Sequence, residues 1–140
     1  MPRALSARVR VVPLALLVAM ALPASGFAAH STGSNTAQWC AAVIKTNTRF
    51  GTMKNKHYIR SALNSPSVQK ALVTYTVKHK AQILAITPAQ IKTAMSHELT
   101  FYANLVANGF KRTTPLAPFS PADSKRLLDF QHAHCGITGP

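Results

Sequence analysis

The stretch Ile86-Thr87-Pro88-Ala89-Gln90-Ile91 carries three helix-start signals within six residues. Thr87 can cap a following helix, Pro88 suits the first helical position because it has no N–H to lose, and Gln90 can reach back to the cap backbone. The isoleucines at the two ends can close a hydrophobic staple across the same turn. Apolar residues recur at helical spacing on both sides, so the stretch predicts the tight corner of a helical hairpin.

The remaining helices follow from caps, prolines, glycines and apolar periodicity. Gly51 weakens the first helix, and Lys54 would fall on its apolar face if it continued, so residues 51–64 are expected to form a bent or irregular connection. Gly109 is the expected C-terminal stop of the third helix, and residues 111–119 form a proline-containing connection. The four predicted helices span about 34–50, 65–86, 88–108 and 120–135. This pattern favours an all-α, antiparallel four-helix bundle.

Several side chains of these helices are expected to face the core. They are Trp39, Cys40, Val43, Asn47 and Phe50 on the first helix, and Leu127, Phe130, Gln131 and His134 on the last.

The N-terminal residues have the pattern of a cleavable signal peptide. Arg3, Arg8 and Arg10 are followed by an apolar run over 11–24, which is shorter than the roughly 20 residues that cross a bilayer. Small residues next to Phe27 offer a cleavage site, so we assign residues 1–28 to the signal peptide and residues 29–140 to one helical domain. The protein is therefore expected to be secreted or associated with the cell envelope, with no transmembrane segment after cleavage.

Two cysteines remain after that cleavage, Cys40 and Cys135. In an oxidising compartment an even pair predicts a disulfide, while two free thiols or a metal pair are the alternatives. In an up-down-up-down bundle the start of the first helix and the end of the fourth lie at the same end, so the two cysteines can meet. Closing a loop of this length would stabilise the fold by roughly 4.6 kcal/mol in the chain-entropy model.

The chain resembles small exported bacterial helical proteins with an early cysteine and a C-terminal Cys-Gly-Ile. The resemblance is carried by Trp39-Cys40, by Cys135-Gly136-Ile137 and by the Thr87-Pro88 corner. It implies a helical fold, and it implies no activity.

The charge is strongly basic. The whole chain has 16 Lys and Arg against three Asp and Glu, and removing the three signal-peptide arginines leaves a formal charge of +10. Anionic envelope polymer or a lipid surface is the partner this favours, and a basic surface that is merely solvated is the alternative. Nucleic acid is not expected, because no recognised binding motif surrounds the basic residues. The candidate anion-binding side chains are Lys45, Arg49, Lys54, Lys56 and Arg60.

Glu98 is the only glutamate and falls on an apolar stripe. Counting from the corner sets it level with Tyr75 on the preceding helix, with His79 and Tyr102 one turn away. A buried carboxylate is costly unless it is paired or protonated. We therefore expect a cluster of Tyr75, His79, Glu98 and Tyr102, either as an internal hydrogen-bond network or as the polar lining of a ligand pocket.

The other histidines are weaker candidates. His132 and His134 are two apart, so on a helix they point about 200° away from each other, and His57 and His97 are expected to be solvated. We expect no metal site and no catalytic residues.

Three functional classes follow. A binding or interaction module at the cell envelope comes first, with no cofactor. A haem or small-ligand carrier, similar in outline to secreted haemophores, is the alternative, and an enzyme is the third. The candidate haem ligands are Tyr75, His79, Met95 and Tyr102.

Overall fold

The computed structural model describes residues 32–111 and 119–139 of the chain. The predicted signal peptide and most of the connection between the third and fourth predicted helices lie outside these residues. The fold is mostly helical, as the sequence predicted. In chain order the elements are α1 (Thr32–Arg49), β1 (Met53–Lys54), β2 (His57–Tyr58), α2 (Arg60–Leu63), α3 (Pro66–Lys78), α4 (Lys80–Ile86), the 3-10 turn η1 (Ala89–Ile91), α5 (Lys92–Ala107), α6 (Pro121–Phe130) and the π-helical turn η2 (Gln131–Cys135).

Helix α1 places its predicted face in the core. Trp39, Val43 and Asn47 have no exposed surface. The Asn47 side chain donates to the Val43 carbonyl oxygen at 2.9 Å and accepts from the Thr52 hydroxyl at 2.7 Å. This polar residue is therefore buried with its hydrogen bonds made, and it ties the end of α1 to the start of the next segment.

The predicted irregular connection after α1 is instead a β-hairpin followed by the short helix α2. Met53 pairs with Tyr58 and Lys54 with His57. Both loop residues have positive φ, 51° at Asn55 and 60° at Lys56, as in a type I′ hairpin turn. The expectation of irregular structure was wrong. The hairpin turn was hard to recognise in the sequence because a lysine stands at the second turn position, where this turn usually has glycine.

The second predicted helix is not continuous, because it divides into α3 and α4 at His79. The His79 backbone has φ −107° and ψ 17°. Its N–H lies 3.2 Å from the Tyr75 carbonyl oxygen and 3.1 Å from that of Thr76, and its ring Nδ1 lies 2.8 Å from the same Tyr75 oxygen. The imidazole thus competes with the helical ladder for one carbonyl group, which gives a physical reason for the break.

The corner at Thr87 is present, but its capping differs from the prediction. The Thr87 hydroxyl donates back to the Ile83 carbonyl oxygen at 2.6 Å, so it satisfies the end of α4 instead of capping α5. Pro88 precedes the 3-10 turn η1, and α5 begins only at Lys92. Ile91 is buried in this turn, as expected for the apolar side of a corner.

The start of α6 has a complete capping box. The Ser120 side chain accepts from the Asp123 N–H at 3.1 Å, and the Asp123 carboxylate accepts from the Ser120 N–H at 3.1 Å. Beyond Phe130 the chain winds into η2, and Gly136 with φ 65° ends it. The wider π-helical turn keeps Cys135 buried while His134 is exposed, so the prediction that His134 points inward was wrong.

The disulfide between Cys40 and Cys135 is confirmed, with 5.2 Å between the two Cα atoms. It joins α1 to η2, two elements that pack together. The C-terminal tail then runs beside β2, where Tyr58 N donates to the Thr138 oxygen at 3.0 Å and Thr138 N donates to the Lys56 oxygen at 2.8 Å.

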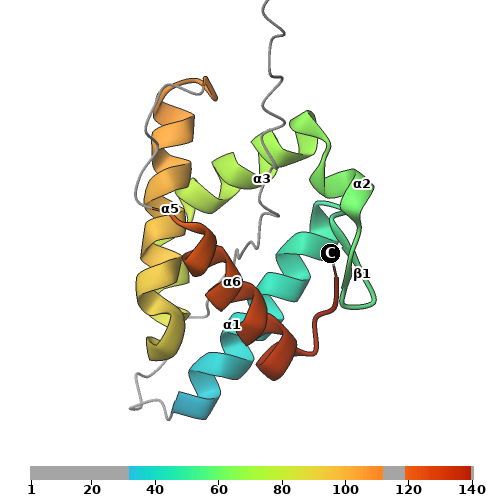
Figure 1. Cartoon of the computed structure of the whole chain (residues 1–140), viewed down its shortest axis with the longest axis vertical. Coiled ribbons are helices and arrows are strands. Elements are labelled where there is room, and N and C mark those ends of the chain that lie inside the picture. The colour runs from blue at the N-terminus through green and yellow to red at the C-terminus, as the bar shows by residue number, and fades with distance from the viewer. Residues whose placement is uncertain (1–31, 112–118, 140) are drawn as a thin grey trace, which may run out of the picture.

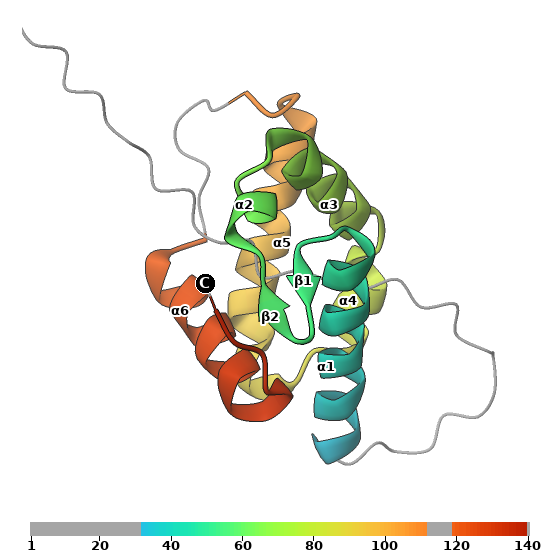
Figure 2. The same cartoon turned by 90° about the vertical axis from the view of Figure 1, so that its right-hand side faces the viewer.

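Helix α5 packs against α3, α4 and α6. The hairpin fills the space between α1 and α6, and the C-terminus lies beside it (Figure 2). A simple antiparallel four-helix bundle is not confirmed, since α3 crosses the other helices obliquely and the hairpin forms part of the core (Figure 1). Within the described residues, no helix is long and apolar enough to span a membrane.

Candidate functional site

Glu98 lies on α5 with no exposed surface. Tyr102, one turn later, donates its hydroxyl to Glu98 Oε1 at 2.8 Å. The other oxygen, Oε2, is buried and has no hydrogen-bond partner among the described residues. The structure therefore brings these two members of the predicted cluster together, inside the core.

A second buried polar pair, Tyr58 and Gln131, was not predicted as part of this cluster. The Tyr58 hydroxyl donates to Gln131 Oε1 at 2.7 Å, across 73 residues of sequence. In the described part of the chain, Gln131 Nε2 and Trp39 Nε1 are also buried without a partner. The sequence feature that could have indicated this pair was a polar residue, Gln131, on the predicted core face of the last helix.

Burial sets the protonation of this core. It raises the pKa of Glu98 well above its ordinary value, and the negative charge of Asp123 adds to the rise, while the hydrogen bond from Tyr102 opposes it. Burial, followed by the charge of Glu98, also raises the pKa of the Tyr58 and Tyr102 hydroxyls. Glu98 thus keeps its proton to a higher pH than an exposed glutamate, and both tyrosines remain hydrogen-bond donors.

Tyr75 and His79 lie apart from Glu98, in a cluster that also contains Arg49 and Phe50. The Tyr75 ring centroid is 4.3 Å from that of His79 and 5.3 Å from that of Phe50. The guanidinium carbon of Arg49 lies 5.4 Å from the Tyr75 centroid and 5.9 Å from the Phe50 centroid. We call these four residues the Arg49 platform. Among the described residues neither Tyr75 nor His79 hydrogen-bonds to Glu98, so the predicted four-residue cluster is divided between the core and the surface.

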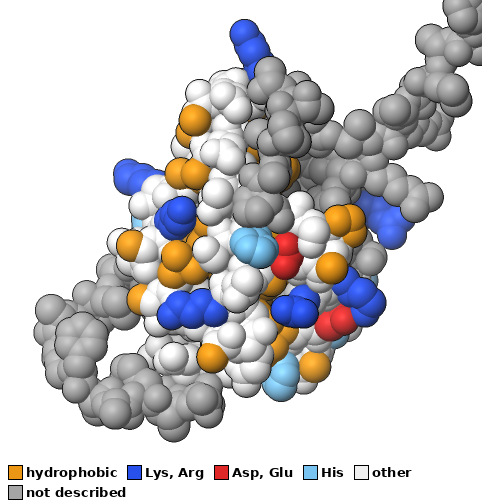
Figure 3. All heavy atoms as spheres, turned by 60° about the vertical axis from the view of Figure 1, so that its left-hand side comes forward, with side chains coloured by type: hydrophobic (Ala, Val, Ile, Leu, Met, Phe, Trp, Pro, Cys, Tyr) orange, Lys and Arg blue, Asp and Glu red, His pale blue; other side chains and the backbone are white. Residues whose placement is uncertain are grey.

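The five candidate anion-binding side chains are all exposed. Lys45 and Arg49 are one turn apart on the outer side of α1, Lys54 and Lys56 flank Asn55 in the hairpin, and Arg60 begins α2. Basic side chains also occur on the face formed around α5, where acidic side chains are few (Figure 3).

Very little of this positive charge is neutralised within the chain. The sequence contains three acidic side chains. Glu98 is buried, Asp123 pairs with His97 at 3.0 Å, and Asp129 pairs with Lys125 at 2.5 Å. Lys125 is thus the one described lysine or arginine that has a carboxylate partner, and the remaining exposed cations are available to an external anion.

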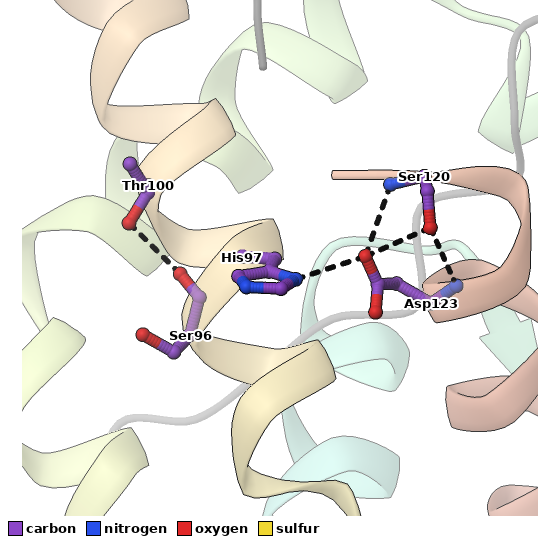
Figure 4. A network of polar contacts seen from close by, with 5 residues as sticks. All are labelled: Ser96, His97, Thr100, Ser120 and Asp123. Atoms are coloured by element: carbon purple, nitrogen blue, oxygen red, sulfur yellow. Dashed lines mark hydrogen bonds and ion pairs between the residues drawn. The ribbon is translucent and has the colours of Figure 1, made fainter. Parts of the chain in front are cut away.

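His97, expected to be solvated, instead links α5 to the start of α6 (Figure 4). Since a carboxylate oxygen only accepts hydrogen bonds, His97 Nδ1 must carry the proton that it shares with Asp123 Oδ2. The hydrogen bonds from His97 and from Ser120 lower the pKa of Asp123 despite its partial burial. His57, also expected to be solvated, is exposed, and its Nδ1 lies 2.9 Å from the Thr138 hydroxyl.

The candidate haem ligands differ in accessibility. Met95 has no exposed surface and Tyr102 is 1% exposed, whereas Tyr75 and His79 are partly exposed. In the ranges that the structure describes, no group of three or more His, Cys, Asp or Glu side chains could hold a metal ion. Of the four candidates, only Tyr75 and His79 are therefore within reach of a ligand from solvent.

Comparisons with protein-family models, with curated proteins and with solved structures gave no match to this chain.

Proposed function

We propose that this protein is a small exported binding module that attaches to anionic polymer of the cell envelope through its basic surface. The observation that carries the proposal is the commitment of all three acidic side chains within the fold, which leaves the basic side chains of α1 and the hairpin unneutralised. A surface of one sign attracts polyanions and speeds their association.

Export is part of this proposal. It is supported by the basic and then apolar N-terminal pattern and by the Cys40–Cys135 disulfide, which is typical of oxidising compartments. The disulfide also stabilises the fold by constraining the unfolded chain, which suits a protein that works outside the cell.

Binding is proposed in preference to catalysis. His97 is oriented by Asp123 in the manner of a general base, but in the part of the chain that the structure describes no hydroxyl or thiol hydrogen-bonds to His97. The pair instead joins two helices, and it fits a structural role.

The test is binding of the mature protein to a soluble polyanion at several salt concentrations. Affinity should fall steeply as salt rises through the physiological range, because each contact releases a counterion. The double reversal Lys54→Glu and Lys56→Glu should weaken binding and flatten the salt dependence, whereas the matched control Lys54→Arg and Lys56→Arg, which keeps both charges, should change neither. Absence of binding even at low salt would refute the proposal.

A haem or small-ligand carrier is the second candidate, favoured by the adjacent and partly exposed Tyr75 and His79. An absorbance spectrum of the mature protein with added haem tests it. A Soret shift that is lost in His79→Ala would support a carrier, and an unshifted spectrum would reject it.

A further inference from the structure

The Arg49 platform differs from the rest of the basic surface because its cation is held in place. Arg49 is exposed at the end of α1, and its guanidinium lies over the Tyr75 and Phe50 rings within the distance at which cation–π attraction operates. An arginine fixed in this way loses less rotamer freedom on binding than a free lysine does.

The Arg49 guanidinium has N–H hydrogen-bond donors available for a ligand. Arginine carries five N–H donors, and a carboxylate or phosphate takes two of them side by side. Among the described residues no carboxylate pairs with it, since Glu98 is buried and the two aspartates pair with His97 and Lys125. The platform is therefore a preorganised oxyanion site without an internal ligand.

The aromatic members add a second kind of contact. Tyr75 and His79 have their ring centroids 4.3 Å apart with planes inclined by 35°, and both are partly exposed. Each presents an apolar ring together with a polar edge, the combination that suits a ligand with both C–H faces and hydroxyl groups. A hydrogen bond from Nδ1 to the Tyr75 carbonyl oxygen fixes the His79 tautomer and leaves Nε2 as an acceptor.

The surroundings favour a hydroxyl-rich polymer over a membrane. Exposed residues close in sequence to the platform on α1 and α3 include Thr48, Thr74 and Lys78, whose polar side chains suit the hydroxyl groups of a polymer better than a lipid layer.

We infer that the Arg49 platform binds the carboxylated sugar units of an anionic polysaccharide, with Arg49 holding the carboxylate and Tyr75 and His79 contacting the sugar ring. This inference rests on the proposed function and names its partner. The other exposed cations then supply attraction that does not distinguish one polyanion from another, and the platform supplies the preference for a uronate.

The experiment compares a soluble polyuronate, polyphosphate of matched charge, and vesicles of phosphatidylglycerol at one salt concentration. Arg49→Lys keeps the charge but loses the planar fork, and Tyr75→Leu removes the ring without changing charge. We expect Arg49→Lys to weaken polyuronate binding about tenfold, the effect of losing one charge-assisted hydrogen bond, and Tyr75→Leu to weaken it by removing the ring contact. Both variants should leave polyphosphate binding nearly unchanged. Arg126→Lys, at an exposed position of α6, is the matched control and should change neither.

Thermal melts establish that the variants fold, and Tyr75→Phe keeps the ring in place if the leucine variant does not fold. Tyr75→Phe should retain most of the uronate preference, because ring contact survives. Equal affinity of the wild type for polyuronate and polyphosphate, equal losses for both in the variants, or binding to vesicles alone would overturn the inference. The first two of these outcomes leave the proposed function standing, whereas no binding to any polyanion at low salt overturns both.

Discussion

Replacing Glu98 with glutamine should change the pH dependence of stability. Glu98 is fully buried with its pKa raised, so the folded protein holds a proton that the unfolded chain releases above about pH 4.5. The stabilising contribution of this group is therefore fully present below that pH and is lost as pH rises through the folded pKa. Over that window the wild type should lose about 1.4 kcal/mol of unfolding free energy for each pH unit.

Glu98→Gln removes this proton linkage while keeping the size of the side chain and an oxygen that can accept from Tyr102. Near pH 4, where the wild-type carboxyl is protonated in both states, the variant should differ by at most about 2 kcal/mol. As pH rises, the variant should gain on the wild type by about 1.4 kcal/mol per unit, and it should become the more stable protein.

The assay is urea unfolding followed by circular dichroism at half-unit steps between pH 4 and pH 8. Asp129→Asn is the matched control, because it makes the same carboxylate-to-amide change at an exposed position and so measures the effect of the substitution type outside the core. Parallel stability curves for the wild type and Glu98→Gln would refute the reasoning, since they would mean that Glu98 has the same pKa in the folded and unfolded chain.

Three further outcomes are expected. Cys135→Ser, which opens the 95-residue link to Cys40, should lower the unfolding free energy by up to about 4.6 kcal/mol in denaturant melts, and an unchanged melt would contradict a bridge that stabilises the fold. His97→Gln should raise the pKa of Asp123 toward its ordinary value in an NMR titration, because the imidazole helps to keep that pKa low. In the wild type, the stabilisation from this pair is lost as pH falls through the Asp123 pKa. An unchanged Asp123 pKa in the variant would contradict the pairing. Gly136→Ala should cost about 1 kcal/mol in thermal melts from the left-handed backbone alone, because nothing lies within 4 Å of the added Cβ, and a stabilised variant would contradict this.

The parts of the fold that were predictable depend on local chemistry. Helix α1 and the Ser120 capping box follow from side chains within a few residues of each other, and the C-terminal stops at Gly109 and Gly136 follow from the freedom of glycine at positive φ. The Cys40–Cys135 disulfide spans the chain, but it was predictable because only two cysteines remained to pair.

The features that the sequence did not predict arise where a side chain competes for a backbone carbonyl group, or where segments far apart in the sequence come into contact. The break at His79 comes from a ring that takes a carbonyl one turn back, and histidine itself is no helix breaker. Thr87 could bond either forward or backward, and the backward choice won because the Ile83 carbonyl needed a partner at the end of α4. The C-terminal tail, more than 80 residues away in the sequence, hydrogen-bonds along the hairpin, and no local sequence pattern predicts this contact.

The same distinction explains the candidate sites. Sequence register placed Glu98 and Tyr102 together because they share one helix, and it also placed Tyr75 and His79 together for that reason. The prediction that the two pairs form one cluster was wrong. Counting residues from the corner gives the position of a side chain along the helix axis, but it does not tell which face of α3 turns toward α5.

That rotation decides which side chains solvent can reach. It exposes Tyr75 beside Arg49, where the two can meet a ligand, and it leaves Glu98 to the core with Tyr102. The buried acid and the surface platform can therefore be altered independently. Glu98→Gln should change the pH dependence of stability without changing polyanion affinity, and Arg49→Lys should do the reverse. A variant of either kind that moved both properties together would show that the core and the platform are coupled through α3, against the separation seen in the structure.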